Sequence, residues 1–108
     1  MHKILLIFGT RPEAIKLCPV IRSLREHPAR FEVKVCVTAQ HREMLDQVLE
    51  AFDVKPDYDL DLMAPNQTLS GSTSRILAGL EPVLKSERPA LVVVQGDTTT
   101  TLCGALGA

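Results

Sequence analysis

The sequence lacks the features that would place it among nucleic-acid-binding, membrane or secreted proteins. Its 108 residues include 12 basic and 13 acidic side chains, so there is no basic excess and no polybasic cluster. No apolar run approaches the roughly 20 residues that span a membrane, and the run that follows Lys3 is shorter than the roughly 7–15 residues of a secretory signal. We therefore expect a cytoplasmic protein with no nucleic-acid or membrane partner.

Cysteines and cofactor motifs are also sparse. Cys18, Cys36 and Cys103 form no CxxC pair, and each lies in an apolar segment, which predicts reduced and buried thiols. His41 and Glu43 are poorly spaced for sharing a metal ion on a helix, and the HExxH, GxGxxG and Walker GK[ST] motifs are all missing. The sequence therefore predicts no metal site and disfavours a site for NAD or ATP.

What the sequence does contain is a regular alternation of strand and helix patterns. Continuous apolar runs at 3–8 and 90–95 are typical of strands buried on both faces, whereas 31–38 alternates apolar with polar residues. Helical spacing predicts helices from Thr10 to about residue 27, over 41–52 and over 68–86, and a further helix after Asp97. Residues 58–62 are a candidate short edge strand.

The helical patterns carry more detailed expectations. Thr10 and Glu13 have the spacing of a capping box, in which each side chain would bond the other's backbone N–H. Pro19 and Pro82 lie inside helical patterns, so we expect a kink at Pro19, unless the first helix starts later, and either a late kink or an early helix end at Pro82. The buried stripe of the first helix is expected to consist of Ile15, Cys18, Ile21 and Leu24, with Val20 at its edge.

This order of elements predicts an α/β fold. Strands that alternate with helices pair in parallel through right-handed crossovers, which favours a Rossmann-like parallel sheet with helices on both faces. Such a sheet normally has more strands than these 108 residues supply. We therefore interpret residues 1–108 as part of a larger Rossmann-like domain. A small complete domain is the alternative.

The turn after the first strand has the composition of an anion site. Gly9 allows close approach to the backbone, and the helix N-terminus beyond Thr10 favours phosphate. Arg11 adds a cationic fork, while Lys16 lies about 140° further around the helix. A purely structural interpretation stays open, with Thr10 as a cap and Arg11 and Lys16 as solvated residues.

The turn after the last predicted strand places a carboxylate at a comparable position. Asp97 follows Gln95-Gly96 at the carboxyl end of that strand, where an acid or base would face a bound ligand. Asp is also a common helix N-cap, so both roles remain open.

Four stretches spread along the chain carry a more specific signal: FGTRPEAIK (8–16), VTAQHREMLDQVL (37–49), PDYDL (56–60) and GDTTTTL (96–102). Together, and with their spacing, they resemble the bacterial non-hydrolysing UDP-N-acetylglucosamine 2-epimerases. The resemblance implies two Rossmann-like domains in the glycosyltransferase-B arrangement, with the active site between them. Residues 1–108 would then be a partial N-terminal Rossmann-like domain, with the rest of that domain and the C-terminal domain absent. It implies interconversion of UDP-GlcNAc and UDP-ManNAc without a cofactor, through anti-elimination of UDP and a 2-acetamidoglucal intermediate, for surface-polysaccharide and cell-wall polymer synthesis.

The resemblance also assigns residues. Arg11 matches the family's arginine near the UDP group, beside Gly9 and Thr10, Lys16 matches the lysine of the same motif, and Asp97 matches an active-site aspartate. Gln40 and His41 match a region where UDP-GlcNAc binds as an activator. Glu43 replaces an expected glutamine there and Asn66 an expected arginine, and both changes weaken contact with a diphosphate.

Other activities remain open at this point. A hydrolysing epimerase or a glycosyltransferase would share the fold, and a non-catalytic sugar-nucleotide-binding fragment would share the first turn. We expect a UDP-sugar substrate and a homodimer for the full-length protein. We expect the 108 residues alone to be inactive, because they hold one side of a two-sided cleft.

Overall fold

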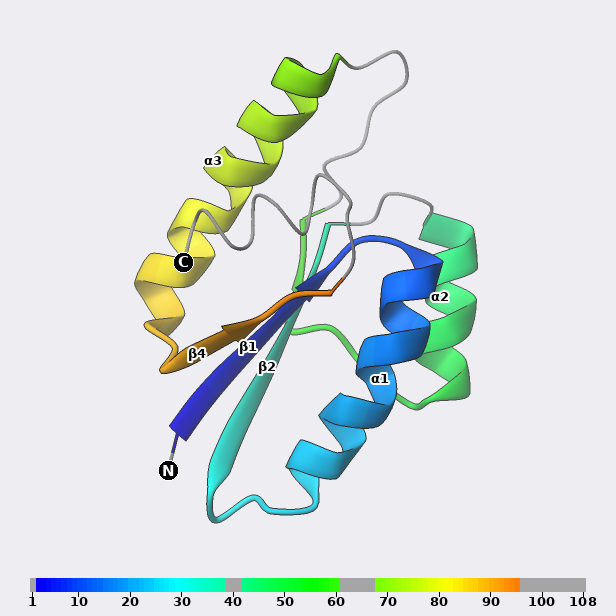
Figure 1. The fold of residues 1–108 in the computed structure, drawn as a ribbon, viewed down its shortest axis with the longest axis vertical. Coiled ribbons are helices and arrows are strands. Elements are labelled where there is room, and N and C mark those ends of the chain that lie inside the picture. The colour runs from blue at the N-terminus through cyan, green and yellow to red at the C-terminus, as the bar shows by residue number, and fades with distance from the viewer. Residues whose placement is uncertain (1, 39–41, 61–67, 96–108) are drawn as a thin grey trace.

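The computed structural model describes residues 2–38, 42–60 and 68–95. Within these ranges the elements are β1 (His2–Phe8), α1 (Arg11–Arg25), β2 (Phe31–Val37), α2 (Arg42–Ala51), β3 (Tyr58–Asp59), α3 (Leu69–Glu87) and β4 (Leu91–Val93). All strand pairs are parallel, in the order β3-β2-β1-β4. Figure 1 shows α1 and α2 on one face of the sheet and α3 on the other. The predicted α/β fold is confirmed, and the helix expected after Asp97 lies outside the described residues.

The continuous apolar run of β1 is buried on both faces. Successive strand residues point to opposite sides of a sheet. Ile4, Leu6 and Phe8 accordingly pack in the core beneath α1 and α2, whereas Leu5 and Ile7 pack in the core beneath α3. The exposed fraction of these five side chains does not exceed 5%. One strand therefore contributes to both hydrophobic cores.

The buried stripe of α1 differs from the prediction. Its buried apolar residues are Ala14, Leu17, Cys18 and Ile21, with Leu24 partly buried. Ile15 is 43% exposed and Val20 is 40% exposed. Steps of three residues, as from 15 to 18 to 21, drift by about 60° each on a helix that turns 100° per residue. Ile15 therefore lies on the solvent side, and its assignment to the buried stripe was wrong. Cys18 and Ile21 are buried as predicted.

Proline does not end either helix. α1 continues through Pro19 to Arg25, and α3 continues through Pro82 to Glu87, so of the two alternatives for Pro82 the early helix end is ruled out. Each proline is exposed, as is the residue four positions before it, Ile15 or Ala78. The carbonyl that each proline leaves without a helical donor therefore lies on the solvent side, where water can bond to it.

β4 is less buried than its sequence predicts. It is shorter than the expected 90–95, and Leu91 is 55% exposed. The cause is its place in the described sheet, where β4 pairs with β1 on one side only.

In the part of the chain that the structure describes, no helix is both long enough and apolar enough to cross a bilayer.

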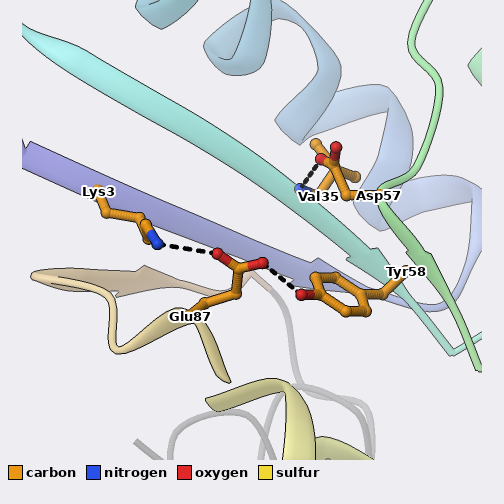
Figure 2. Close-up of polar contacts among 5 residues, drawn as sticks. All are labelled: Lys3, Val35, Asp57, Tyr58 and Glu87. Carbon is orange, nitrogen blue, oxygen red and sulfur yellow. Dashed lines mark hydrogen bonds and ion pairs between the residues drawn. The ribbon is translucent and has the colours of Figure 1, made fainter. Parts of the chain in front are cut away.

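A polar cluster joins three elements on the α3 side of the sheet (Figure 2). Lys3 Nζ of β1 lies 3.0 Å from Glu87 Oε1 at the end of α3, and the hydroxyl of Tyr58 in β3 donates to Glu87 Oε2. The bond from Tyr58 and then the one from Lys3 hold the pKa of Glu87 below its ordinary value. The Glu87 partner raises the pKa of Lys3 and of Tyr58. This Lys3–Glu87–Tyr58 cluster links the end of α3 to β1 and β3.

The short strand β3 is held by a side chain as well as by its ladder. The Val35 N–H donates to the Asp57 carboxylate at 2.8 Å, and the Asp57 N–H donates back to the Val35 carbonyl at 2.8 Å (Figure 2). Asp57 thus extends the pairing with β2 by one position before Tyr58. The candidate edge strand is confirmed over Tyr58–Asp59.

The same truncation at two positions of α1 tests which face is buried. Ile21→Ala should lower the free energy of unfolding by about 2–5 kcal/mol, because it leaves a cavity in the core. Ile15→Ala removes a half-exposed side chain and should cost less than about 1 kcal/mol. Urea unfolding of the two variants measures both values. Equal losses would contradict the observed orientation of α1.

The Lys3–Glu87–Tyr58 cluster should make stability depend on pH. Because the pKa of folded Glu87 is below its ordinary 4.5, its stabilisation is present above that pH and is lost as the pH falls through the folded value. The stability difference between the wild type and Glu87→Gln should therefore shrink on acidification below pH 4.5. Raised pKa values at Lys3 and Tyr58 predict a separate loss only as the pH rises through their folded values.

Glu81→Gln serves as the matched control, because Glu81 pairs with Lys85 on the exposed side of the same helix. Unfolding free energies across pH 3 to 7 would contradict the cluster's role if the two variants showed the same pH dependence.

Candidate functional site at the turn between β1 and α1

The candidate site lies at the carboxyl edge of the parallel sheet. Gly9 and Thr10 are the only residues between β1 and α1, so the chain passes directly from the buried strand to the helix N-terminus. Thr38 follows β2 at the same edge, is fully buried, and donates its N–H to the Phe8 carbonyl at 3.0 Å. This edge is where open α/β sheets bind their ligands.

Glu13 determines the shape of this turn. Its carboxylate is only 2% exposed, and Oε1 accepts the Gly9 N–H at 2.9 Å. Thr10 has the extended backbone of an N-cap, but its side chain makes no capping bond. The predicted reciprocal capping box is therefore wrong. Glu13 reaches back as expected, but it bonds Gly9 instead of Thr10, and the Thr10 hydroxyl takes no part.

The Thr10 hydroxyl is buried without a partner. The residue is 9% exposed, and within the described parts of the chain Oγ1 has no hydrogen-bond partner. Burying a hydroxyl without a hydrogen bond is unfavourable, and such groups are rare in folded proteins. A ligand oxygen placed at this turn would supply the missing partner.

Arg11 and Lys16 are both exposed on α1, as the solvated and the ligand-binding interpretations each require. Arg11 is the first residue of the helix, where the partial positive charge of the N-terminus also favours an anion. Pro12 contributes no N–H, so the first turn has one backbone donor fewer than an ordinary helix start. An anion here would depend more on Arg11 and on side-chain hydroxyls.

Several predicted site residues lie outside the described residues. They are Asp97 of the second turn and the candidate activator contacts Gln40 and His41, so their assignments stay predictions. The same holds for Asn66.

The two cysteines in the described ranges are free and buried, as predicted. Burial raises the pKa of Cys18, and burial together with the charge of Asp59 raises the pKa of Cys36 to about 12. Thiolate is the nucleophilic form of cysteine, so neither residue is suited to nucleophilic chemistry near neutral pH. Cys103 lies outside the described residues.

Sequence reasoning missed the role of Glu13 and the Lys3–Glu87–Tyr58 cluster. The T-x-x-E spacing did signal that Glu13 returns to the start of the helix, but not which N–H it bonds. No local pattern links Lys3, Tyr58 and Glu87, because only the fold brings them together.

Comparison with known proteins agrees with this geometry. The family model for UDP-N-acetylglucosamine 2-epimerase matches residues 22–108. The UDP-N-acetylglucosamine 2-epimerases of Yersinia pestis and Escherichia coli K12 are 59% and 58% identical over 96% and 98% of the chain. The chain spans 27% and 28% of the length of these two relatives.

Solved structures show the same fold. The UDP-GlcNAc 2-epimerase of Neisseria meningitidis, bound to UDP-GlcNAc, matches with a TM-score of 0.91 and 54% identity over 97% of this chain and 28% of its own. The S. aureus MnaA co-structure with UDP matches with a TM-score of 0.93 and 52% identity over 99% of this chain and 28% of its own. With the family model and these identities, the chain belongs to the UDP-N-acetylglucosamine 2-epimerase family.

Proposed function

We propose that the full-length protein containing this chain interconverts UDP-GlcNAc and UDP-ManNAc. Membership of the family supports the reaction, and the buried hydroxyl of Thr10 at the N-terminus of α1 is the structural observation that carries the ligand site. The chain spans about 28% of its relatives. A second Rossmann-like domain is therefore part of the proposal, with the substrate between the two domains.

The proposed reaction breaks two bonds and reforms them. A base removes the proton from C2 of the sugar while the C1–O bond to UDP breaks on the opposite face, which leaves 2-acetamidoglucal. UDP then adds back at C1, and a proton returns to C2 from the other side. The reaction needs a positioned base and favourable contacts to the departing diphosphate.

The two turns would divide these tasks. Arg11 and the N-terminus of α1 would bind the diphosphate, Gly9 would allow it to approach the backbone, and the Thr10 hydroxyl would donate to a phosphate oxygen. Asp97, which follows β4 in the sequence, would act as acid or base at the sugar. Lys16, in the second turn of α1, would be the second catalytic residue.

The proposal extends to the assembly of the protein. We expect a cytoplasmic homodimer whose product supplies polysaccharide synthesis, with UDP-GlcNAc near Gln40 and His41 as a candidate activator. The 108 residues alone carry one side of the cleft, so we expect them to be inactive.

The reaction is tested by running the full-length enzyme with UDP-GlcNAc in D2O. Removal and return of the C2 proton should place deuterium at C2 of UDP-ManNAc, detected by NMR and mass spectrometry.

Asp97→Asn should abolish turnover while leaving thermal unfolding unchanged, because the amide keeps a side-chain oxygen for capping but is not a base.

Epimerisation without deuterium at C2 would rule out the elimination mechanism. Release of free ManNAc would identify a hydrolysing enzyme instead. An Asp97→Asn variant that is active but unstable would assign Asp97 to the helix cap.

The Thr10 hydroxyl is tested by Thr10→Val, which keeps the shape of the side chain and removes its oxygen. Stability should not fall, because the hydroxyl has no partner in the described protein. The affinity for UDP, measured by calorimetry, should fall by about 10- to 100-fold through loss of a bond to a charged group. Thr10→Ser retains the hydroxyl and should bind UDP as the wild type does. Unchanged UDP affinity in Thr10→Val would contradict the assignment.

A further inference from the structure

The burial of Glu13 is unusual for its residue type. Most glutamates in folded proteins are exposed, whereas Glu13 is only 2% exposed at the first turn of α1. Its Oε1 accepts a hydrogen bond from the Gly9 N–H, at 2.9 Å. A negative charge is favourable at a helix N-terminus in the free protein. It would repel a diphosphate bound at the same turn, so its charge does not serve the ligand.

The direction of the Gly9 N–H shows what the carboxylate replaces. The Phe8 carbonyl accepts a bond from Thr38, and therefore points toward β2. The N–H and C=O of a trans peptide point in opposite directions, so the Gly9 N–H points to the β4 side of β1. In the described residues the register between β1 and β4 ends at Leu6 opposite Val93. The Glu13 oxygen thus stands where a strand carbonyl would continue the ladder.

This bond connects the end of the strand to the helix that follows it. Only Gly9 and Thr10 separate β1 from α1, so fixing the Gly9 N–H against the helix restricts the backbone of both residues. The restriction sets the directions of the Thr10 hydroxyl and of Arg11. The Thr10 hydroxyl makes no capping bond, and among the described residues it has no hydrogen-bond partner.

We infer that Glu13 is a positioning residue for the diphosphate site. Its carboxylate oxygen holds the Gly9–Thr10 turn so that the Thr10 hydroxyl and Arg11 meet the ligand, and Glu13 itself does not touch the ligand. The inference rests on the proposed function for the identity of the ligand. What matters is the acceptor oxygen, not the negative charge.

Two substitutions in the full-length protein separate the acceptor from the charge. Glu13→Gln removes the charge and keeps an oxygen that can accept the Gly9 N–H, whereas Glu13→Ala removes both. Glu13→Gln should retain UDP affinity and kcat/KM within about 3-fold of the wild type, and Glu13→Ala should lower both by about 10- to 100-fold, as expected for misplaced groups. Amide exchange of the Gly9 N–H should quicken in Glu13→Ala and not in Glu13→Gln.

Val83→Ala is the matched control for a general loss of stability. Val83 is 4% exposed in the core beneath α3, away from the turn. This variant should lower the melting temperature and leave UDP affinity and kcat/KM unchanged. If Glu13→Ala also lowers the melting temperature and leaves UDP affinity and kcat/KM unchanged, Glu13 has only a structural role and the inference is wrong.

The remaining outcomes are also decisive. Equal losses in Glu13→Gln and Glu13→Ala would show that the charge is what acts, and would overturn the inference. If the wild type binds UDP but does not epimerise UDP-GlcNAc, the proposed reaction fails, and the UDP affinities of the Glu13 variants still decide the role of Glu13.

Discussion

The structure depends on the burial of β1. This strand lies between β2 and β4 in the sheet and is covered by α1 and α2 on one face and by α3 on the other (Figure 1). The part of such a strand that is covered on both faces has no contact with solvent, which is why the residues from Ile4 to Phe8 are apolar without alternation. Both cores are assembled on it. A slip of one residue in its register would exchange the side chains of the two cores.

A very short connection joins the buried strand β1 to the helix that carries the candidate site. Two residues join the strand to α1, and a buried carboxylate from the helix bonds the first of them. The polar groups at this turn are therefore placed by the core and not by a flexible loop. The cost of such placement is visible at Thr10, whose buried hydroxyl lacks a partner in the described residues. Groups that are already held in their binding positions lose less conformational freedom when a ligand binds, which favours binding.

The sequence was sufficient to predict the fold because each element has a strong local signal. The apolar run of β1 and the helical spacing of Leu45, Val48 and Leu49 in α2 correspond directly to buried residues. Errors arose where position in the sheet or on the helix decides exposure. Leu91 is exposed because β4 has one neighbour in the described sheet, and Ile15 is exposed because its spacing drifts off the buried face.

At the site, residue types were easier to predict than bonding partners. The composition of the Gly9–Glu13 turn indicated an anion site, but the choice between Thr10 and Gly9 as the partner of Glu13 depends on the direction of one peptide, which no spacing encodes. The most direct test is a crystal structure of the full-length protein with UDP. Our account predicts a phosphate oxygen within about 3.2 Å of Thr10 Oγ1, with the Glu13–Gly9 bond intact. A diphosphate bound away from this turn, or a Glu13 side chain turned toward the ligand, would contradict it.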